Sequence, residues 1–273
     1  MASQMPKRVH ILPIARAHER VVKIFEQQMP DRVYILYNKD PLETHGDINE
    51  EIRQGVEKLV KERTMCGEHG EIHNVGVNFY RFGEALVESY ELIYKEEMKN
   101  GNQVFANVSG GTKPMAIALW VACALSESSK PVYFPAENYE RKEDGTVASY
   151  GVAESFEVAT FEMLQMADIL PTAKEKHDIM LYLLDNHPIG VTDLLVSIGE
   201  ISDDPSKEDR SERNKIVQRY HRYARQLEES GITNKQDNVY SLTNTGELIA
   251  NLIEKKKEID KEIEEQTSVT DFS

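Results

Sequence analysis

The strongest constraint on the fold of this chain is an alternation of two hydrophobic periods through its first 160 residues. Short runs rich in β-branched and aromatic residues, which favour strands, are separated by segments whose apolar residues recur at helical spacing. Strands that alternate with helices form βαβ units, and such units assemble a parallel sheet. The expected strands are 9–15, 32–38, 71–80, 103–108 and 131–137, the expected helices are 18–29, 48–63 and 83–100, and a further hairpin or strand pair is expected within 146–160.

The pattern changes after residue 160, where helical segments predominate. The predicted order is short helices, a long helix and then two short extended runs. This is the order of elements in a winged helix-turn-helix domain. We therefore predict two domains, an α/β, Rossmann-like parallel-sheet domain over 1–160 and an α+β winged helix-turn-helix domain over 161–273. The expected helices of the second domain are 162–168, 172–186, 191–199, 210–230 and 246–266, with the extended runs inside 232–243.

The composition is that of a soluble globular protein, with 40% apolar and 29% charged residues. No apolar run approaches the roughly 18 residues that span a bilayer, and the first residues lack a signal-peptide pattern, so we expect a cytoplasmic protein. The net charge of −15 argues against sequence-blind nucleic-acid binding over the whole surface, although not against a local basic patch. Cys66 and Cys123 lack metal-ligand spacing, so we expect no metal and no cofactor; Cys123 and Trp120 lie in an apolar helix and are expected in the core.

One short turn, with the sequence SGGTK over residues 109–113, has the chemistry of an anion site. Gly110 and Gly111 allow a positive φ and a close backbone approach, and Thr112 is a suitable N-cap for the helix that follows. Lys113 adds a full positive charge to the partial charge of the helix N-terminus. Neither a Walker A loop nor a GxGxxG motif is present. These residues alone leave two possibilities, a phosphate site or a tight turn with a surface lysine.

The string NxSGGTK, which begins at Asn107 where a predicted strand ends, resembles the CARF domain of CRISPR-associated proteins. Together with the helices beyond residue 160, residues 7–250 are similar in pattern to archaeal regulators that join a CARF domain to a winged helix. The resemblance implies a homodimer that binds a cyclic oligoadenylate and double-stranded DNA, and cyclic tetra-adenylate would match a two-fold axis. It implies ligand contacts from the loops after the first and fourth strands, namely Pro13, Ile14, Ala15, Arg16, Asn107, Ser109, Gly110, Gly111, Thr112 and Lys113.

The helix expected over 210–230 has a basic face in an otherwise acidic chain. Between residues 207 and 225 there are seven Lys or Arg and three Asp or Glu, and Ile216, Tyr220, Tyr223 and Leu227 recur at the spacing of a buried face. Such a reversal of charge is typical of a recognition helix, whereas an exposed helix with internal ion pairs is the alternative. The expected DNA contacts are Lys215, Gln218, Arg219, Arg222 and Arg225, with Lys235 from a wing whose tip is expected at 234–236.

Two further interpretations follow from the same residues. RNA-cleaving HEPN domains carry an Arg and a His close together, but here seven residues separate Arg213 from His221, which is too many for that motif. A winged helix that contacts another protein instead of DNA remains a second alternative. In that case the affinity for DNA would be negligible and would lack a steep dependence on salt.

Cleavage of the cyclic ligand is the enzymatic alternative to simple sensing. Ser109, Thr112 and Lys113 could stabilise developing charge in such a ring-nuclease reaction, but they would serve plain binding equally well. The only candidate bases are His10 and His18, and only because they lie near the first strand. We therefore predict a ligand-responsive transcription regulator without assigned catalytic residues, and we keep ring-nuclease activity as the alternative.

Overall fold

The structure of the chain is a computed structural model, in which contacts divide the chain into two units. The first unit contains residues 1–167 and 263–273, and the second contains residues 168–262. Each unit is described by itself. The structure describes residues 5–14, 22–26, 28–40, 46–63, 71–126, 128–134, 138–141, 147–150, 159–160, 170–186, 188–204 and 209–270.

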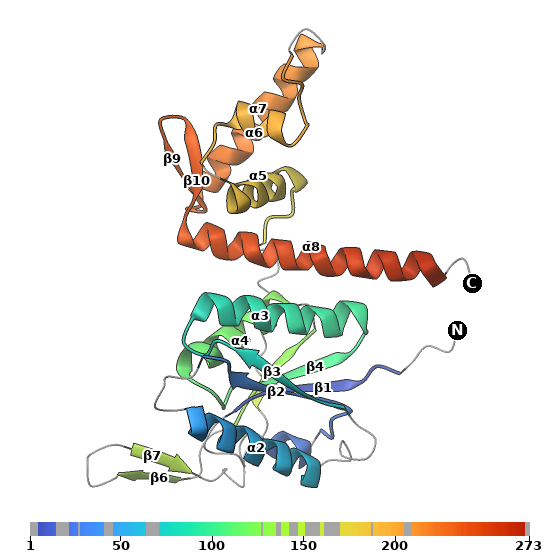
Figure 1. Cartoon of the computed structure of the whole chain (residues 1–273), viewed down its shortest axis with the longest axis vertical. Helices are drawn as coiled ribbons and strands as arrows, with labels where there is room; N and C mark the ends of the chain where they lie inside the picture. The colour runs from blue at the N-terminus through green and yellow to red at the C-terminus, as the bar shows by residue number, and fades with distance from the viewer. Residues whose placement is uncertain are drawn as a thin grey trace. The chain divides into compact units, whose positions relative to one another are not determined.

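The first unit is built on a sheet of strand order β3-β2-β1-β4-β5-β8 (Figure 1). The first five strands in this order are parallel to their neighbours, and β8 is antiparallel to β5. The inner strands are almost continuously buried, which is why they consist of apolar runs rather than alternating ones. The predicted parallel, Rossmann-like sheet is thus confirmed. The strands are β1 (Arg8–Pro13), β2 (Arg32–Asn38), β3 (Glu71–Val77), β4 (Gln103–Asn107), β5 (Lys130–Tyr133) and β8 (Ala159–Thr160).

The pairing expected within residues 146–160 is wrong. β7 (Val147–Tyr150) pairs with β6 (Asn138–Arg141), which precedes the expected segment, in a separate antiparallel sheet. β8 (Ala159–Thr160) joins the main sheet beside β5 instead. Alternating hydrophobicity identifies extended segments, but the choice of partner depends on tertiary contacts that the pattern does not contain.

Helices cover both faces of the main sheet (Figure 1). α2 (Gly46–Arg63) lies on one face, and α3 (Phe82–Tyr94) and α4 (Lys113–Leu125) lie together on the other. α3 continues into a π-helical turn, η4 (Lys95–Lys99). Of the helix predicted over 18–29, the structure describes a short 3-10 helix, η1 (Lys23–Glu26), together with Val22, Gln28 and Met29.

One face of α4 is apolar and yet uncovered within the first unit. Cys123 is buried, as predicted, but Ile117 and Trp120 are 55% and 37% exposed, so the expectation of a core Trp120 is wrong. α4 is apolar on nearly every side, and among the described residues it packs mainly against the sheet and α3. Hydrophobic periodicity cannot indicate which side of such a helix is covered.

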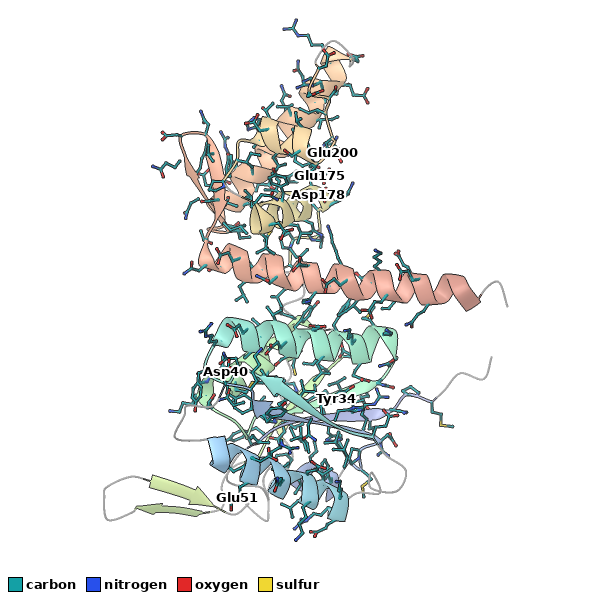
Figure 2. All side chains as sticks on the ribbon, in the orientation of Figure 1. Tyr34, Asp40, Glu51, Glu175, Asp178 and Glu200 are labelled. Carbon is teal, nitrogen blue, oxygen red and sulfur yellow. The ribbon has the colours of Figure 1, made fainter. Side chains whose placement is uncertain are left out.

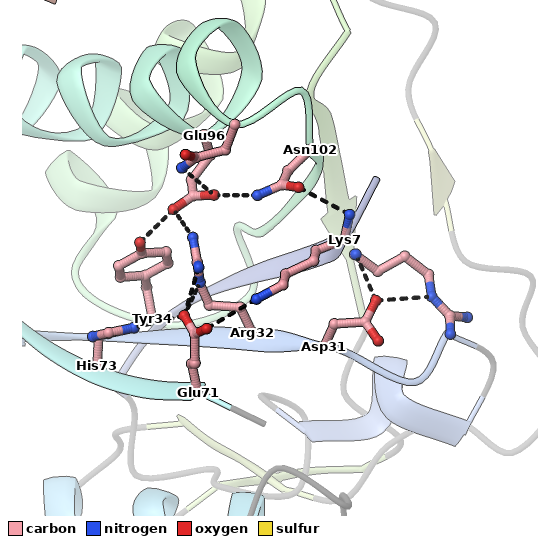
Figure 3. A network of polar contacts seen from close by, with 10 residues as sticks. Lys7, Asp31, Arg32, Tyr34, Glu71, His73, Glu96 and Asn102 are labelled. Carbon is pink, nitrogen blue, oxygen red and sulfur yellow. Dashed lines mark hydrogen bonds and ion pairs between the residues drawn. The ribbon is translucent and has the colours of Figure 1, made fainter. Parts of the chain in front are cut away.

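A polar network joins the amino ends of the strands in the first unit (Figure 3). The buried Glu96 carboxylate accepts hydrogen bonds from Arg32 at 2.6 Å, from the Tyr34 hydroxyl at 2.5 Å and from Asn102 at 2.6 Å. Arg32 also pairs with Glu71 at 2.5 Å. Burial acts to raise the pKa of Glu96, but these hydrogen bonds outweigh it and hold the pKa below the ordinary value. The network thus satisfies a charge that burial would otherwise make very unfavourable, at the sheet edge opposite the glycine-containing turn.

The described residues of the second unit form three helices, a hairpin and a further helix, in that order, and the helix predicted over 162–168 lies outside the described residues. Buried residues such as Leu183, Leu195, Tyr220, Tyr240 and Leu252 come from each of these parts of the unit. The elements are α5 (Lys174–Asp185), α6 (Val191–Ser197), α7 (Arg210–Glu229), β9 (Thr233–Gln236), β10 (Val239–Leu242) and α8 (Asn244–Thr270), of which residues up to 262 belong to this unit.

The two-residue turn of the hairpin, Asp237 and Asn238, lies directly after the predicted tip. Asp237 and Asn238 have φ values of 50° and 65°, the left-handed conformation that two-residue hairpin turns require. Asn and Asp tolerate this conformation better than other non-glycine residues. Lys235 and its neighbours in 234–236 therefore lie on β9 rather than at the tip, so that expectation was wrong.

The start of α8 approaches the end of α7 closely at Gly246. Thr243 makes the junction, because its hydroxyl donates to the Gly231 carbonyl at 2.8 Å and accepts the Gly246 N–H at 3.0 Å. The Thr243 N–H donates to the Ile232 carbonyl at 3.0 Å. A Cβ on Gly246 would overlap the carbonyl oxygen of Ile232, which is backbone and cannot rotate away.

We expect Gly246→Ala to destabilise the second unit by about 3 kcal/mol or more, because the added methyl group must push the start of α8 away from the Ile232 carbonyl. Urea unfolding followed by circular dichroism measures this loss. Gly190→Ala is the matched control, since a Cβ at Gly190 would meet nothing closer than 3.5 Å. Equal unfolding free energies for the two variants would contradict the steric argument.

Candidate functional site

The SGGTK turn lies at the reversal point of the strand order. β1 and β4 are neighbours, but the chain leaves β1 toward β2 and leaves β4 toward β5, on the other side. In open parallel sheets the crevice beyond the carboxyl ends at such a point is where ligands bind. The Gly111 N–H donates to the Ile14 carbonyl at 3.1 Å, so the two loops predicted to share a ligand lie side by side. Ala15 and Arg16, which were also predicted there, lie outside the described residues.

Gly111 is required by the geometry of this turn. Its φ is +76°, and a Cβ would lie 3.1 Å from the Cβ of Pro13 and 3.3 Å from the Cγ of Met115. Only glycine adopts this conformation freely and also allows the contact with the end of β1. The backbone of the turn is thereby held against β1.

The polar side chains of the turn are used within the protein. The buried Asn107 accepts the Ser109 N–H at 2.8 Å, and the Ser109 hydroxyl oxygen accepts the Phe134 N–H at 2.6 Å. The Thr112 hydroxyl donates to the Phe79 carbonyl at 2.6 Å and accepts the Met115 N–H at 3.4 Å, the bond of an N-cap. These side chains, which the sequence suggested as ligand contacts, therefore fix the shape of the turn.

The turn contains one exposed cation and backbone N–H groups without acceptors among the described residues. Lys113 is exposed, and within the part of the chain that the structure describes it forms no ion pair. In the same part of the chain the N–H groups of Thr112 and Lys113 have no hydrogen-bond acceptor, and neither has that of Gly110, although Gly110 is itself buried. Unpaired N–H groups at a helix N-terminus together with a lysine form a favourable site for a phosphate.

Carboxylates lie near the neighbouring strand ends. Asn78, at the end of β3, donates to Asp40 at 3.2 Å and to Glu84 at 3.3 Å, and Lys39 pairs with Glu88 at 2.5 Å (Figure 2 labels Asp40). Their negative charge opposes an anion on the β2–β3 side of the sheet edge. An anionic ligand is therefore best accommodated on the side of the β4–α4 turn.

The basic face predicted on α7 is exposed. Tyr220 and Leu227 are buried on the opposite side, as predicted, and Ile216 and Tyr223 are half-buried. Arg219 is partly neutralised by Glu175 at 3.2 Å, and the Arg222 guanidinium lies 5.2 Å from the ring centre of Tyr223 (Figure 2 labels Glu175). The exposed polar residues of this face are Lys215, Gln218, Arg219, Arg222 and Arg225, and Lys235 of β9 is also exposed, 5.5 Å from the ring centre of Tyr240.

His10 is not a candidate base for a ligand at this edge. It is 0% exposed, with its ring stacked on Phe105 and edge-on to Phe25, and neither ring nitrogen has a hydrogen-bond partner among the residues that the structure describes. Burial lowers its pKa to about 3; nearby Arg8 adds to this effect and Asp31 opposes it. The suggestion that His10 is a base was therefore wrong, because its position on a strand does not reveal what covers it. His18 lies outside the described residues.

Comparison with known proteins finds one family model for part of the first unit. A family model described as "HFX_2341_N:-like, N-terminal" matches residues 8–139, which include the SGGTK turn. No curated protein matches the chain. Within the described residues no helix is long and apolar enough to cross a membrane, and no cluster of potential metal ligands occurs.

Several solved structures match the chain at low sequence identity and with TM-scores below 0.5. A type III CRISPR defence DNA nuclease activated by cyclic oligoadenylate has 17% identity over 54% of this chain and 21% of its own, with a TM-score of 0.36. Csm6 of Enterococcus italicus, bound to cyclic hexa-2'-fluoro-hexa-dAMP, has 14% identity over 83% and 55%, with a TM-score of 0.44. Can2 of Sulfobacillus thermosulfidooxidans, in complex with cyclic tetra-adenylate, has 13% identity over 96% and 68%, with a TM-score of 0.33. The chain thus spans 21% and 55% of the length of the first two.

We expect His10→Leu to reduce the acid sensitivity of the first unit. Unfolding lets the imidazole regain its ordinary pKa of 6.5, whereas in the fold it stays neutral down to about 3. The contribution of neutral His10 to stability is therefore complete above pH 6.5 and declines as the pH falls from 6.5 toward 3, by about 1.4 kcal/mol per pH unit. Between pH 6.5 and pH 5 the variant should lose about 2 kcal/mol less unfolding free energy than the wild type, as measured by urea unfolding at both pH values.

His10→Phe is the second variant, because an aromatic ring preserves the packing against Phe105 and removes only the titrating group. The two variants should show the same shallow dependence on pH. Parallel profiles for the wild type and both variants would contradict the assignment.

Proposed function

We propose that this protein is a ligand-responsive transcription regulator whose first unit binds a cyclic oligoadenylate and whose second unit binds double-stranded DNA. The observation that carries the proposal is the SGGTK turn at the reversal point of the strand order, with its backbone held by Gly111, an exposed Lys113 and N–H groups that lack acceptors among the described residues. Donors without acceptors suit a polyanion. The string NxSGGTK, which resembles the CARF domain, supports a cyclic oligoadenylate, with cyclic tetra-adenylate as the first candidate.

A homodimer is part of the proposal, and α4 supports it. Lys113, Ile117 and Trp120 are spaced by four and three residues, so they follow one face of the helix, and all three are exposed. An apolar helix face of this kind is covered in most soluble proteins. If a second copy covers this face, two turns meet across the axis, and a ring of four nucleotides has the matching symmetry.

Binding of cyclic tetra-adenylate should raise the melting temperature of the protein. At about 100 times Kd, a ligand that binds only the native state adds about 2.7 kcal/mol, or about 5 °C or more for a unit of this size. Lys113→Ala should weaken binding about tenfold, because one charge-assisted contact is lost. Lys58→Ala is the control, since Lys58 is an exposed lysine of α2.

The same samples distinguish sensing from cleavage. Chromatography of the nucleotide after incubation should show the intact ring, and linear products would favour the ring-nuclease alternative. The absence of both a melting shift and linear products would contradict a ligand of this class.

DNA binding by the second unit is supported by the exposed face of α7. Lys215, Gln218, Arg222 and Arg225 are spaced by three, four and three residues, on the side opposite the buried Tyr220. Arginine and glutamine can contact base edges, whereas lysine and arginine contact phosphates. In this proposal α7 is the recognition helix of a winged helix, and the β9–β10 hairpin, with Lys235, is the wing.

Affinity for DNA should fall steeply with salt. For a duplex of about 30 base pairs, log K plotted against log salt should have a slope of about −0.9 for each phosphate contacted, and Arg222→Ala should make the slope shallower by about one. Arg219→Ala should have the smaller effect, because Arg219 already pairs with Glu175. Arg53→Ala on α2 is the control. Negligible affinity at low salt would instead favour a winged helix that contacts protein.

A further inference from the structure

Two exposed tyrosines are sequence neighbours of residues whose backbone is hydrogen-bonded to the SGGTK turn. The Thr112 hydroxyl is bonded to the Phe79 carbonyl, and the next residue, Tyr80, is 51% exposed. The Ser109 hydroxyl is bonded to the Phe134 N–H, and the preceding residue, Tyr133, is 39% exposed. Tyr80 lies three residues beyond the end of β3 and Tyr133 is the last residue of β5, so each tyrosine is next in the chain to a residue that is hydrogen-bonded to the turn.

The backbone that carries Tyr80 is fixed by several hydrogen bonds. Its N–H donates to the Asn78 side chain at 3.2 Å, and the Phe79 N–H donates to the buried Asn38 at 3.1 Å. The Phe79 ring is itself buried in the core. Tyr80 is therefore attached to a rigid support whose position relative to the turn is set by the bond from Thr112.

Tyr133 is supported in an equivalent way. It is the last residue of β5, and the next side chain, Phe134, is buried. The Val108 N–H donates to the Val132 carbonyl at 2.9 Å, which joins the turn to β5 a second time. Both exposed rings thus start from backbone that does not need to be ordered when a ligand binds, and this lowers the entropic loss on binding.

Exposed aromatic rings next to an anion site suit a nucleotide better than a bare phosphate. Nucleobases stack on tyrosine rings, and each such contact contributes about 1–3 kcal/mol whatever the base, that is, about five- to 150-fold in affinity. Stacking also involves no net charge, so the carboxylates of Asp40 and Glu84 near the end of β3 do not oppose it as they oppose a phosphate.

We propose that Tyr80 and Tyr133 are stacking platforms for two bases of the ligand, on either side of the phosphate-binding SGGTK turn. This inference rests on the proposed function, because it concerns the bases of the same nucleotide ring. In this proposal the tyrosines that follow β3 and end β5 select a cyclic nucleotide by its bases. The β4–α4 turn attracts its phosphates.

Binding of fluorescently labelled cyclic tetra-adenylate to the full chain tests the inference. Tyr80→Leu and Tyr133→Leu should each weaken binding about ten- to 100-fold, because leucine preserves apolar bulk but has no aromatic face. Tyr80→Phe and Tyr133→Phe should bind within about threefold of the wild type, because stacking needs the ring and not the hydroxyl. Tyr182→Leu, a half-buried tyrosine of α5 in the second unit, is the control and should bind like the wild type.

The variants separate this inference from the proposed function. If the wild type binds and Lys113→Ala weakens binding while both leucine variants match the wild type, only the stacking inference is overturned. If the wild type does not bind the ring at all, the proposed function fails and the inference fails with it. Melting temperatures and gel filtration are measured for every variant. Unfolding or loss of the dimer would also weaken binding by a leucine variant. If the corresponding phenylalanine variant then binds equally weakly, the inference is also overturned.

Discussion

Parallel pairing between β1 and β4 places Val9 opposite Val104 and Ile11 opposite Ala106, in the most completely buried part of the first unit. The chain leaves β1 toward β2 and leaves β4 toward β5, in opposite directions along the sheet. The loops that follow these two strands therefore diverge at their carboxyl ends, and in open parallel sheets such loops leave a crevice between them. The positions of the Gly111–Ile14 hydrogen bond and of the α4 N-terminus follow from this pairing. The candidate site therefore depends first on strand order, and only then on the residues of the loop.

The SGGTK turn illustrates how a binding loop is made rigid. The side chains of Asn107, Ser109 and Thr112 are bonded to neighbouring backbone, whereas the N–H groups of Thr112 and Lys113 have no acceptor among the described residues. This arrangement is the reverse of the one that the residue types suggest, in which hydroxyls contact the ligand. Backbone donors held in place by side chains require little reorganisation when an anion binds, so the affinity is not reduced by the ordering of a flexible loop.

In the second unit the corresponding rigid support is the junction around Thr243 and Gly246. There α8 begins against the carbonyl groups that end the α7 turn, so the hairpin between them cannot shift without breaking the bonds of Thr243. The same unit holds the basic face of α7 outward by burying Tyr220 and Leu227. Glu175 of α5 already pairs with Arg219 on that face and competes with a polyanion for it. The positive charge available on α7 is therefore smaller than the sequence indicates.

By itself the sequence determined the kind and order of the elements, including the parallel strands, α2, α7 and the capped start of α4, because burial of one face imposes a local period on the residues. It also located the glycine turn, since the requirement of Gly111 for a positive φ is a local property. Only the tertiary structure decided that β7 pairs with β6, that Trp120 is exposed and that His10 is enclosed by Phe25 and Phe105. It likewise decided that Thr112 meets Phe79 and Ser109 meets Phe134. These contacts join segments far apart in the chain, and no local period records which distant backbone a side chain will reach.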